Sequence, residues 1–256
     1  MDVNKSSYTF GFAIVMVVVV ASLLATAAIS LKPFQDKNIV AEKMQNILTT
    51  IGVDVSREEA AQAFEDNITE SFVLNNKGEV VEGDAFVVDL GVEVKRDMNE
   101  QQLPVFVSEK EGLKTYILPM RGKGLWGPIW GYLALQNDMS TISGAVFDHK
   151  SETPGLGAEI SLGWFQEPFI GKTIYDGETL VSVKVVKGGA KEDDMHGVDG
   201  ISGGTITANG VSNMLEERLN MYAPYLQLKR NEMMGMEMDS LNIDTVSGFT
   251  SNIIVQ

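Results

Sequence analysis

The chain has 256 residues, a formal net charge of -15 at pH 7, no cysteine and two histidines. The negative charge argues against nucleic acid, and against an anionic lipid surface, as a partner, because both repel an acidic chain. The lack of cysteine excludes disulfides, thiolate-bound zinc or iron–sulfur centres and a cysteine nucleophile, and His149 and His196 are too few for a site of several imidazoles. Redox chemistry by this chain would therefore need a bound organic cofactor.

The N-terminal segment has the properties of a membrane-spanning helix. Residues 6–31 contain no charged side chain, and the run Phe10–Leu24 is almost entirely apolar. At 1.5 Å per residue this segment would reach roughly 39 Å as a helix, more than the hydrocarbon core of about 30 Å. We expect an uncleaved anchor over residues 9–31, after a short N-terminus at 1–8. A cleaved signal peptide is the competing interpretation, because Ala25-Thr26-Ala27 resembles a cleavage site, but the apolar run is longer than a signal sequence needs.

The lysines near this segment bear on its orientation. Lys32, Lys37 and Lys43 follow the apolar run, and Lys5 precedes it. Positive charge usually lies on the cytoplasmic side of a membrane helix. Charge alone therefore predicts that the large domain stays in the cytoplasm.

The residues after the anchor carry the signals of two further helices. Lys32-Pro33 predicts the end of the first helix, because proline lacks the N–H group that the helix needs. Apolar residues at helical spacing over 40–51 predict a second helix that ends at Gly52. The Ser-Arg-Glu-Glu sequence at 56–59 resembles a capping box that opens a further helix towards Phe64.

The middle of the chain is predicted to form short strands. Runs of β-branched and aromatic residues are separated by turn sequences containing glycine, asparagine or aspartate, and a helical pattern over 156–165 lies among them. This predicts an α+β domain over 32–230, with a mainly antiparallel sheet and flanking helices, followed by a Met-rich tail over 231–256. The expected strands cover 71–74, 80–81, 85–90, 105–107, 113–118, 130–135, 140–147 and 180–186.

Residues 122–127 read Gly-Lys-Gly-Leu-Trp-Gly, a literal G-x-G-x-x-G. A dinucleotide-binding turn needs a helix after the glycines, whereas Pro128 and strand-like residues follow here, so we reject that assignment. Trp126 and Trp130 suit either of two roles. They could pin a hairpin to the core, or lay a flat aromatic ligand against the backbone.

Residues 152–157 read Glu-Thr-Pro-Gly-Leu-Gly and precede a helix expected over 158–165. Thr153 can cap that helix or donate a hydrogen bond, and the two glycines allow close approach of a ligand ring. On these residues alone, a plain helix start explains the segment equally well.

Residues 199–207 read Asp-Gly-Ile-Ser-Gly-Gly-Thr-Ile-Thr. Gly203 and Gly204 permit a left-handed backbone whose N–H groups can close on an anion. Apolar residues at helical spacing over 211–222 place the start of an amphipathic helix at 205–209, where free N–H groups favour a phosphate. The alternative is a glycine-rich turn capped by one of its own hydroxyls, those of Ser202, Thr205 and Thr207.

The sequence at 199–207 resembles the flavinylation motif Asp-Gly-x-Ser/Thr-Gly-Ala-Ser/Thr, in which the last hydroxyl is joined to FMN through a phosphoester. Gly204 replaces the alanine of that motif. Together with the segments at 122–127 and 152–157, in the same order along the chain, the motif is similar to that of the C subunits (NqrC) of the Na+-translocating NADH:quinone oxidoreductases. The resemblance extends from the anchor to about Arg230.

The resemblance implies that Thr205 carries FMN covalently and that the three segments surround the flavin. It implies no metal ligands and no catalytic side chain in this chain. The residues that it places at the flavin, besides Thr205, are Ser202, Gly203, Gly204, Thr207, Thr153, Leu156, Gly157, Trp126 and Gly127.

Charged side chains flank the motif at 199–207. Asp193, Asp194 and Asp199 could orient the threonine hydroxyl, or help a transferase hold Mg2+ during attachment, and solvated loop acids explain them equally well. Lys184 and Lys187 could steady the phosphate of a bound FMN.

The resemblance further implies an electron-transfer subunit of a sodium-pumping NADH:quinone reductase, which relays electrons between an iron centre and the flavin of the B subunit. The implied partners are the A, B, D, E and F subunits, membrane lipid, and a flavin transferase that installs the cofactor. The family places the domain in the periplasm, on a single span of the bacterial inner membrane. This is the opposite of the orientation that charge predicts, and we follow the family.

Two other interpretations stay open. The G subunit of the Rnf ferredoxin:NAD oxidoreductase shares the motif and the anchor, but the long region between anchor and first glycine motif favours the NqrC family. A membrane-anchored structural or adhesive surface protein would explain the apolar helix and the acidic β-rich part. That interpretation leaves the glycine motifs unexplained.

Overall fold

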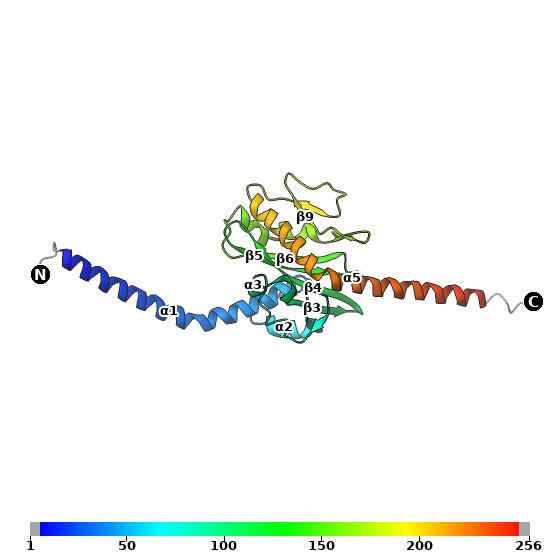
Figure 1. The fold of residues 1–256 in the computed structure, drawn as a ribbon, viewed down its shortest axis with the longest axis horizontal. Coiled ribbons are helices and arrows are strands. Elements are labelled where there is room, and N and C mark those ends of the chain that lie inside the picture. Colours follow the sequence, from blue (N-terminus) through cyan, green and yellow to red (C-terminus); the bar gives the residue numbers. More distant parts are fainter. Residues whose placement is uncertain (1–5, 251–256) are drawn as a thin grey trace, which may run out of the picture.

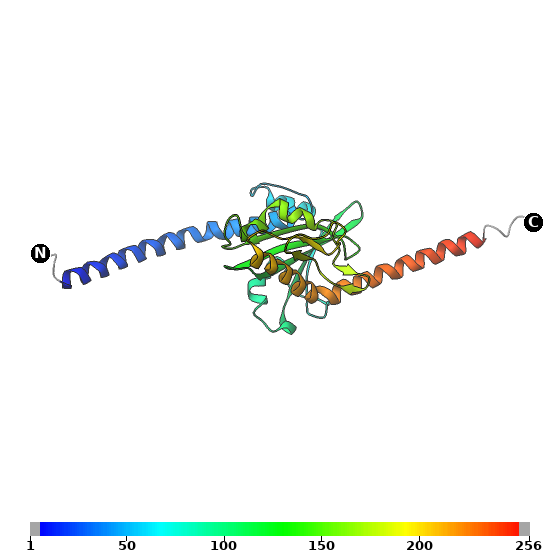
Figure 2. The same ribbon diagram turned by 90° about the horizontal axis from the view of Figure 1, so that it is seen from above.

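A six-stranded antiparallel sheet is the centre of the domain, and helices cover both of its faces (Figures 1 and 2). The structure, a computed structural model, describes residues 6–250, and the surroundings of side chains for residues 6–233. The strands follow the order β2-β1-β3-β4-β5-β6 across the sheet. They are β1 (Glu70–Leu74), β2 (Val80–Val81), β3 (Leu103–Lys110), β4 (Leu113–Lys123), β5 (Pro128–Leu135) and β6 (Ile142–His149).

Smaller elements complete the domain. Two short strand pairs lie outside the main sheet: antiparallel β7 (Tyr175–Asp176) with β8 (Thr179–Leu180), and parallel β9 (Lys184–Val186) with β10 (Gly197–Asp199). The α-helices are α1 (Ser6–Thr49), α2 (Ala60–Asn67), α3 (Leu90–Glu93), α4 (Gly163–Gln166) and α5 (Thr205–Thr250). The 3-10 helices are η1 (Met98–Glu100), η2 (Gly157–Ser161) and η3 (Glu167–Phe169). The predicted α+β class with a mainly antiparallel sheet is confirmed.

Side chains along β4 and β5 alternate between two separate cores. Leu118 and Met120 of β4 and Leu133 of β5 belong to the larger core, whereas Ile117 and Ala134 belong to the smaller core on the opposite face. A strand directs successive side chains to opposite faces, so strands that are apolar on both sides need a cover on each. The sheet is therefore the middle layer of three.

Helix α5 covers the larger core. Leu215, Leu219 and Tyr222 are fully buried. The Tyr222 hydroxyl donates to the carbonyl oxygens of Pro104 in β3 and Pro119 in β4, at 2.9 and 3.2 Å. Burial raises the pKa of the Tyr222 phenol above its ordinary value, so the hydroxyl stays a donor. One side chain thus ties α5 to two neighbouring strands.

The last turns of α1, helix α2 and residues 85–88 cover the smaller core. Ile47 of α1 is fully buried there. Phe64 of α2 meets Phe86 and Phe106 edge to face, with ring centroids 5.5 and 5.9 Å apart. The helix that contains the predicted anchor is therefore packed directly against the domain.

The prediction that the first helix ends at Lys32-Pro33 is wrong. Helix α1 continues through Pro33 to Thr49, and it is the one helix within residues 6–250 that is long and apolar enough to cross a membrane. Proline removes one hydrogen bond and bends a helix, and the residues around Pro33 are exposed, so nothing packed beside the helix resists the bend. Figure 1 shows α1 changing direction before it reaches the domain.

The two helices predicted after the anchor are present. The first is the end of α1, and Gly52 follows it with φ +76°. Only one half of the predicted capping box forms: the backbone N–H and the hydroxyl of Ser56 both donate to the Glu59 side chain, at 3.2 and 2.7 Å, and no side chain caps the helix itself. The helix that follows, α2, begins at Ala60.

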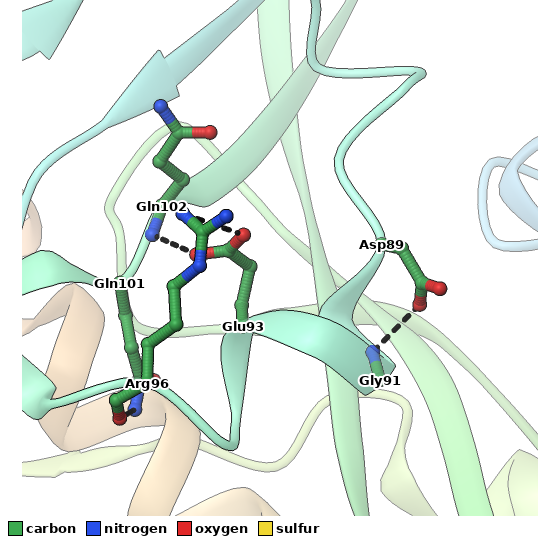
Figure 3. A network of polar contacts seen from close by, with 6 residues as sticks. All are labelled: Asp89, Gly91, Glu93, Arg96, Gln101 and Gln102. Atoms are coloured by element: carbon green, nitrogen blue, oxygen red, sulfur yellow. Dashed lines mark hydrogen bonds and ion pairs between the residues drawn. The ribbon is translucent and has the colours of Figure 1, made fainter.

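The strand predicted over 85–90 is wrong. Asp84 accepts a hydrogen bond from the backbone N–H of Phe86 at 2.8 Å, and Asp89 accepts one from Gly91 at 2.7 Å, so both hold turns. Figure 3 shows the bond between Asp89 and Gly91. Aspartate competes with the sheet for backbone donors in this way. The apolar residues between the two aspartates pack on the smaller core as an irregular segment that leads into α3.

Two other predicted elements are broken rather than absent. The predicted strand at 180–186 is divided into β8 and β9, with Ser182 between them at φ +63°. The predicted helix over 158–165 is divided into η2 and α4, separated by Leu162 in an extended conformation. The other six predicted strands correspond to β1 to β6.

Helix α5 continues past the predicted end of the domain. It includes Pro224 and runs to Thr250, so residues 231–250 of the predicted Met-rich tail are helical, and 251–256 lie outside the described residues. Both views show α1 and the C-terminal part of α5 leaving the domain at opposite ends (Figures 1 and 2).

Candidate functional site

The motif at 199–207 forms a loop that leads from β10 into the first turn of α5. Gly203 has φ +76°, a conformation that side chains disfavour, and the N–H of Gly204 donates to Ile201 at 3.1 Å. Helix α5 begins at Thr205, and the N–H of Ala208 makes an early helical bond to Gly204 at 2.9 Å. The first N–H groups of a helix have no partner within it. Thr205 is half-buried. It lies at the N-terminus of a long helix, the end that favours an anion.

A cavity of about 440 Å³ lies beside this loop. Such a volume is within the range of small-molecule sites. Much of its wall is glycine backbone, and Gly188 and Gly189 both have positive φ. The walls are formed by Val185, Lys187, Gly188, Gly189, Asp199, Gly200, Ile201, Ser202, Gly203, Thr205, Ala208 and Asn209.

These walls fit an FMN phosphate. A helix N-terminus faces the same loop, and Lys187 supplies a positive charge. The N–H groups of Gly189 and Gly200 already donate to the carbonyl oxygen of Val186, at 3.2 and 3.0 Å, so the donors at the start of α5 are the ones that suit a phosphate. Lys184, by contrast, is exposed on β9 and is not part of the cavity wall. Of the two lysines considered from the sequence, only Lys187 lies where it could meet a phosphate.

Glu152 joins the three predicted segments. Its side chain is 5% exposed. Oε1 accepts the backbone N–H of Trp126 at 2.8 Å, and Oε2 accepts the Thr207 hydroxyl at 2.6 Å. The segments at 122–127, 152–157 and 199–207 therefore meet, as the resemblance implied. Sequence reasoning did not select Glu152, because both of its partners are far away along the chain.

Glycines make this meeting possible. A Cβ on Gly203 would come within 2.7 Å of Leu156 Cδ2, and one on Gly204 within 2.9 Å of the Leu156 carbonyl oxygen. A Cβ on Gly157 would come within 2.5 Å of both Glu152 Oε2 and Thr207 Oγ1. Contacts this short do not occur in folded proteins. At Gly204 and Gly157 the neighbours are backbone and a buried hydrogen-bonded pair, so a side chain there would push the segments apart, whereas at Gly203 the exposed Leu156 side chain would have to move aside.

The expected flavin contacts differ in exposure. Trp126 is 68% exposed and Leu156 is 41% exposed, and Thr153 and Ser202 also face solvent. Gly127 is half-buried. Such apolar side chains at the surface beside a functional loop are typical of a binding face. Of these five residues only Ser202 lines the cavity.

Thr207 is an exception among these residues. It is 1% exposed, and its hydroxyl is held by Glu152. It therefore faces the protein interior, where it supports the first turn of α5, and not the open side of the loop. The expectation that Thr207 contacts a ligand disagrees with this placement.

The acidic residues near the loop support the backbone. Asp199 Oδ1 accepts the N–H of Ala190 at 2.8 Å, and Asp194 Oδ1 accepts the N–H of His196 at 2.9 Å. Asp193 is exposed. Among the residues that the structure describes, no three metal-ligating side chains lie close enough together to hold an ion.

The two histidines also have local roles. His149 Nδ1 accepts the backbone N–H of Glu152 at 3.2 Å, and His196 Nδ1 lies 2.7 Å from the carbonyl oxygen of Thr173. His149 thereby helps to hold the segment that carries Glu152.

Comparison with known proteins defines the class of this site. The family model for the FMN-binding domain matches residues 124–220, a range that includes the segments at 152–157 and 199–207 and residues 124–127 of the first segment. The fold and the site are thus those of a flavin-binding domain behind an apolar N-terminal helix.

The chain belongs to the NqrC family, the C subunits of the Na+-translocating NADH-quinone reductases, which are oxidoreductase complexes. It is 31% identical over 226 residues to the C subunit of Vibrio alginolyticus, covering 81% of this chain and 88% of the relative. Identity to the C subunit of Pseudomonas aeruginosa is 32% over 240 residues, covering 83% of this chain and 91% of the relative.

Solved structures of the family share the fold. The crystal structure of the NADH-quinone reductase C subunit from Parabacteroides distasonis superposes with a TM-score of 0.72 at 46% identity, covering 77% of this chain and 96% of that chain. The Shewanella oneidensis NqrC structure superposes with a TM-score of 0.65 at 26% identity, covering 75% and 98%. This membership favours NqrC over the Rnf protein and over a structural surface protein.

Proposed function

We propose that the chain carries FMN covalently, through a phosphoester to the hydroxyl of Thr205. The observation that carries the proposal is the position of Thr205, at the N-terminus of α5, in the wall of the 440 Å³ cavity and next to a loop of glycines. Ser202 lies in the same loop, and Thr207 is enclosed by the protein, so Thr205 is the motif hydroxyl at the helix start that faces the cavity.

Attachment would be a phosphoryl-group transfer from FAD, carried out by a separate flavin transferase with Mg2+. The Thr205 oxygen forms a bond to the phosphorus of the FMN half, and the bond from that phosphorus to the bridging oxygen of the diphosphate breaks. AMP leaves, and the hydroxyl proton passes to a base of the transferase. The N–H groups at the start of α5, together with Lys187, would then neutralise the charge of the phosphoester.

The flavin ring would lie on the exposed face beside the loop, against Trp126, Gly127, Thr153 and Leu156. The exposure of Trp126 and Leu156 supports this placement, because an aromatic ring gains by covering apolar surface. Gly157, Gly203 and Gly204 would contribute by letting the loop approach Leu156 closely.

In the complex, the chain would relay electrons between an iron centre and the flavin of the B subunit, as a partner of the A, B, D, E and F subunits. When bound, FMN supplies the redox chemistry; the residues of the chain hold and orient it and limit its contact with water. Helix α1 would be a single span of the inner membrane, with the domain in the periplasm. A covalent bond suits that compartment, because a flavin lost there could not be replaced from a cytoplasmic pool.

The experiment is to co-express the chain with a flavin transferase and to change the acceptor. Thr205→Ala should fold but lack flavin fluorescence in a denaturing gel, because the attachment oxygen is gone. Thr205→Ser keeps a hydroxyl at that place and should retain flavin, and Thr179→Ala, at an exposed threonine of β8 outside the cavity wall, is a matched control that should also retain it. Intact mass measures occupancy in each variant. Covalent flavin at the wild-type level in Thr205→Ala would refute the proposal.

A further inference from the structure

Glu152 is a buried carboxylate at the centre of the site. It lies in the segment that precedes η2, and its two oxygens accept hydrogen bonds from two different elements, the turn at Trp126 and the first turn of α5. Hydrogen bonds to an ionised acceptor are stronger than neutral ones. A buried carboxylate with good partners is costly to disturb.

The space around Glu152 is built to the size of a carboxylate. A Cβ on Gly124 would come within 2.5 Å of Oε1, and one on Gly157 within 2.5 Å of Oε2. One glycine of the segment at 122–127 and one of the segment that carries Glu152 itself therefore each leave room for one oxygen. The backbone N–H of Glu152 itself donates to His149 Nδ1 at 3.2 Å, which fixes the base of the side chain.

This arrangement controls the position of the proposed acceptor. Thr207 is two residues after Thr205 in the same helical turn, so a bond from Thr207 to Glu152 sets how that turn faces the rest of the site. The bond to the Trp126 N–H sets the turn that carries one of the exposed aromatic side chains. Glu152 thus connects the attachment point and the ring face through a single group.

The same group also places a negative charge in a poorly hydrated position. The carboxylate is beside the start of α5, whose dipole favours an anion there. Charges inside a protein interact more strongly than charges in water, because the surroundings screen them less. A flavin bound at this loop would lie within the field of that charge.

We propose that Glu152 is a positioning residue for the flavin site, which aligns Thr205 for flavin attachment and lowers the reduction potential of the attached flavin. The proposal rests on the proposed function, since it concerns the same bound flavin. A fixed negative charge opposes the arrival of electrons on a neighbouring group, so it makes that group harder to reduce. The alignment of Thr205 depends on the hydrogen bond from the Thr207 hydroxyl to Glu152. The lower reduction potential depends on the negative charge of the Glu152 carboxylate.

Two substitutions at Glu152 separate these parts. Glu152→Gln keeps the shape and removes the charge, because its amide oxygen can accept the Trp126 N–H and its NH2 group can donate to Thr207. Its flavin should have a higher midpoint potential than the wild-type flavin in a spectroelectrochemical titration of the purified flavinylated chain. Glu152→Asp keeps the charge and shortens the reach by one methylene group. Its flavin occupancy should fall severalfold, while the flavin that is attached keeps a potential near the wild-type value.

Two controls complete the design. Thr207→Val removes the hydroxyl bond and keeps the charge, so it should lower the rate of attachment and leave the potential near that of the wild type. Glu216→Gln makes the same charge change on an exposed site of α5, and it should alter neither quantity. Thermal unfolding of each unmodified chain identifies variants that fail to fold.

The inference would be overturned if the flavin of Glu152→Gln had the wild-type potential and if Glu152→Asp and Thr207→Val both reached the wild-type flavin occupancy. That result differs from failure of the proposed function, in which the wild-type chain itself carries no covalent flavin.

Discussion

Single residues decide how close the three segments can come. Gly203 combines a positive φ with close contact to Leu156, whereas Gly155 has φ +75° and open space around it. Substituting the two glycines therefore separates two effects of an added side chain. At Gly155 we expect backbone strain alone, and at Gly203 we expect backbone strain together with a clash against Leu156.

We predict that Gly203→Ala lowers both stability and flavin occupancy, and that Gly155→Ala lowers only stability, by about 1 kcal/mol. The extra loss at Gly203 comes from displacing the Leu156 side chain, which lies on the proposed flavin face. Urea unfolding of the unmodified chains and gel fluorescence after flavinylation measure the two effects. Equal flavin occupancy in the two variants would show that the close contact with Leu156 is not needed.

The site was partly predictable from sequence at this scale, for reasons that particular residues make plain. Thr205 could be placed at a helix start because glycines and a periodic apolar pattern surround it locally. Glu152 could not be selected, because its bonds to Trp126 and Thr207 cross 26 and 55 residues. The same bond explains why Thr207, which the motif places beside the acceptor, turns inward.

Helices and strands were predicted best where the spacing of apolar residues alone determines the secondary structure. Strands β3 to β6 follow alternating or continuous apolar patterns, and they are present at the expected places. The segment at 85–90 has the same apolar content, but side-chain bonds of Asp84 and Asp89 hold it in turns. The continuation of α1 through Pro33 was not predicted, because proline usually ends a helix. A long helix with nothing packed beside it tolerates the proline by bending.

Glu42 of α1 lies at the contact between α1 and the sheet, and its charge there reduces the stability of the folded state. Burial, and then the neighbouring Asp148 carboxylate, raise the pKa of Glu42 above its ordinary value of 4.5. The folded state therefore holds the Glu42 proton more tightly than the unfolded state, so this group reduces stability as the pH rises above 4.5.

We predict that Glu42→Gln increases the free energy of unfolding near pH 7 and has no such effect well below pH 4.5, where the carboxyl is protonated in both the folded and the unfolded state. Denaturant unfolding of the two chains across this pH range measures the difference. Because Glu42 is partly open to solvent, screening keeps the gain small. An equal gain at both ends of the range would assign it to packing instead of charge.

The whole molecule is a flavin-binding domain that packs on the last turns of a long helix, α1, whose N-terminal part is apolar. Ile47 and Leu48 bury the last turns of α1 in the domain, while residues 6–31 are almost entirely exposed and uncharged. The domain must therefore lie close to whatever the apolar part of α1 enters. Flanking lysines predict a cytoplasmic domain, and the proposed attachment and relay need a periplasmic one.

The natural absence of cysteine allows a direct test of orientation. A Glu178→Cys substitution introduces a single thiol in the exposed turn between β7 and β8. The proposed periplasmic orientation predicts that a membrane-impermeant maleimide labels this chain in intact cells. Labelling that appears only after the inner membrane is broken would place the domain in the cytoplasm.

The most direct test of the central claim is peptide mass spectrometry of the native complex, isolated while it is turning over. Our account predicts that the peptide containing Thr205 carries the mass of FMN joined through a phosphoester, and that fragmentation assigns the added mass to Thr205. An active complex in which that peptide is unmodified would contradict it.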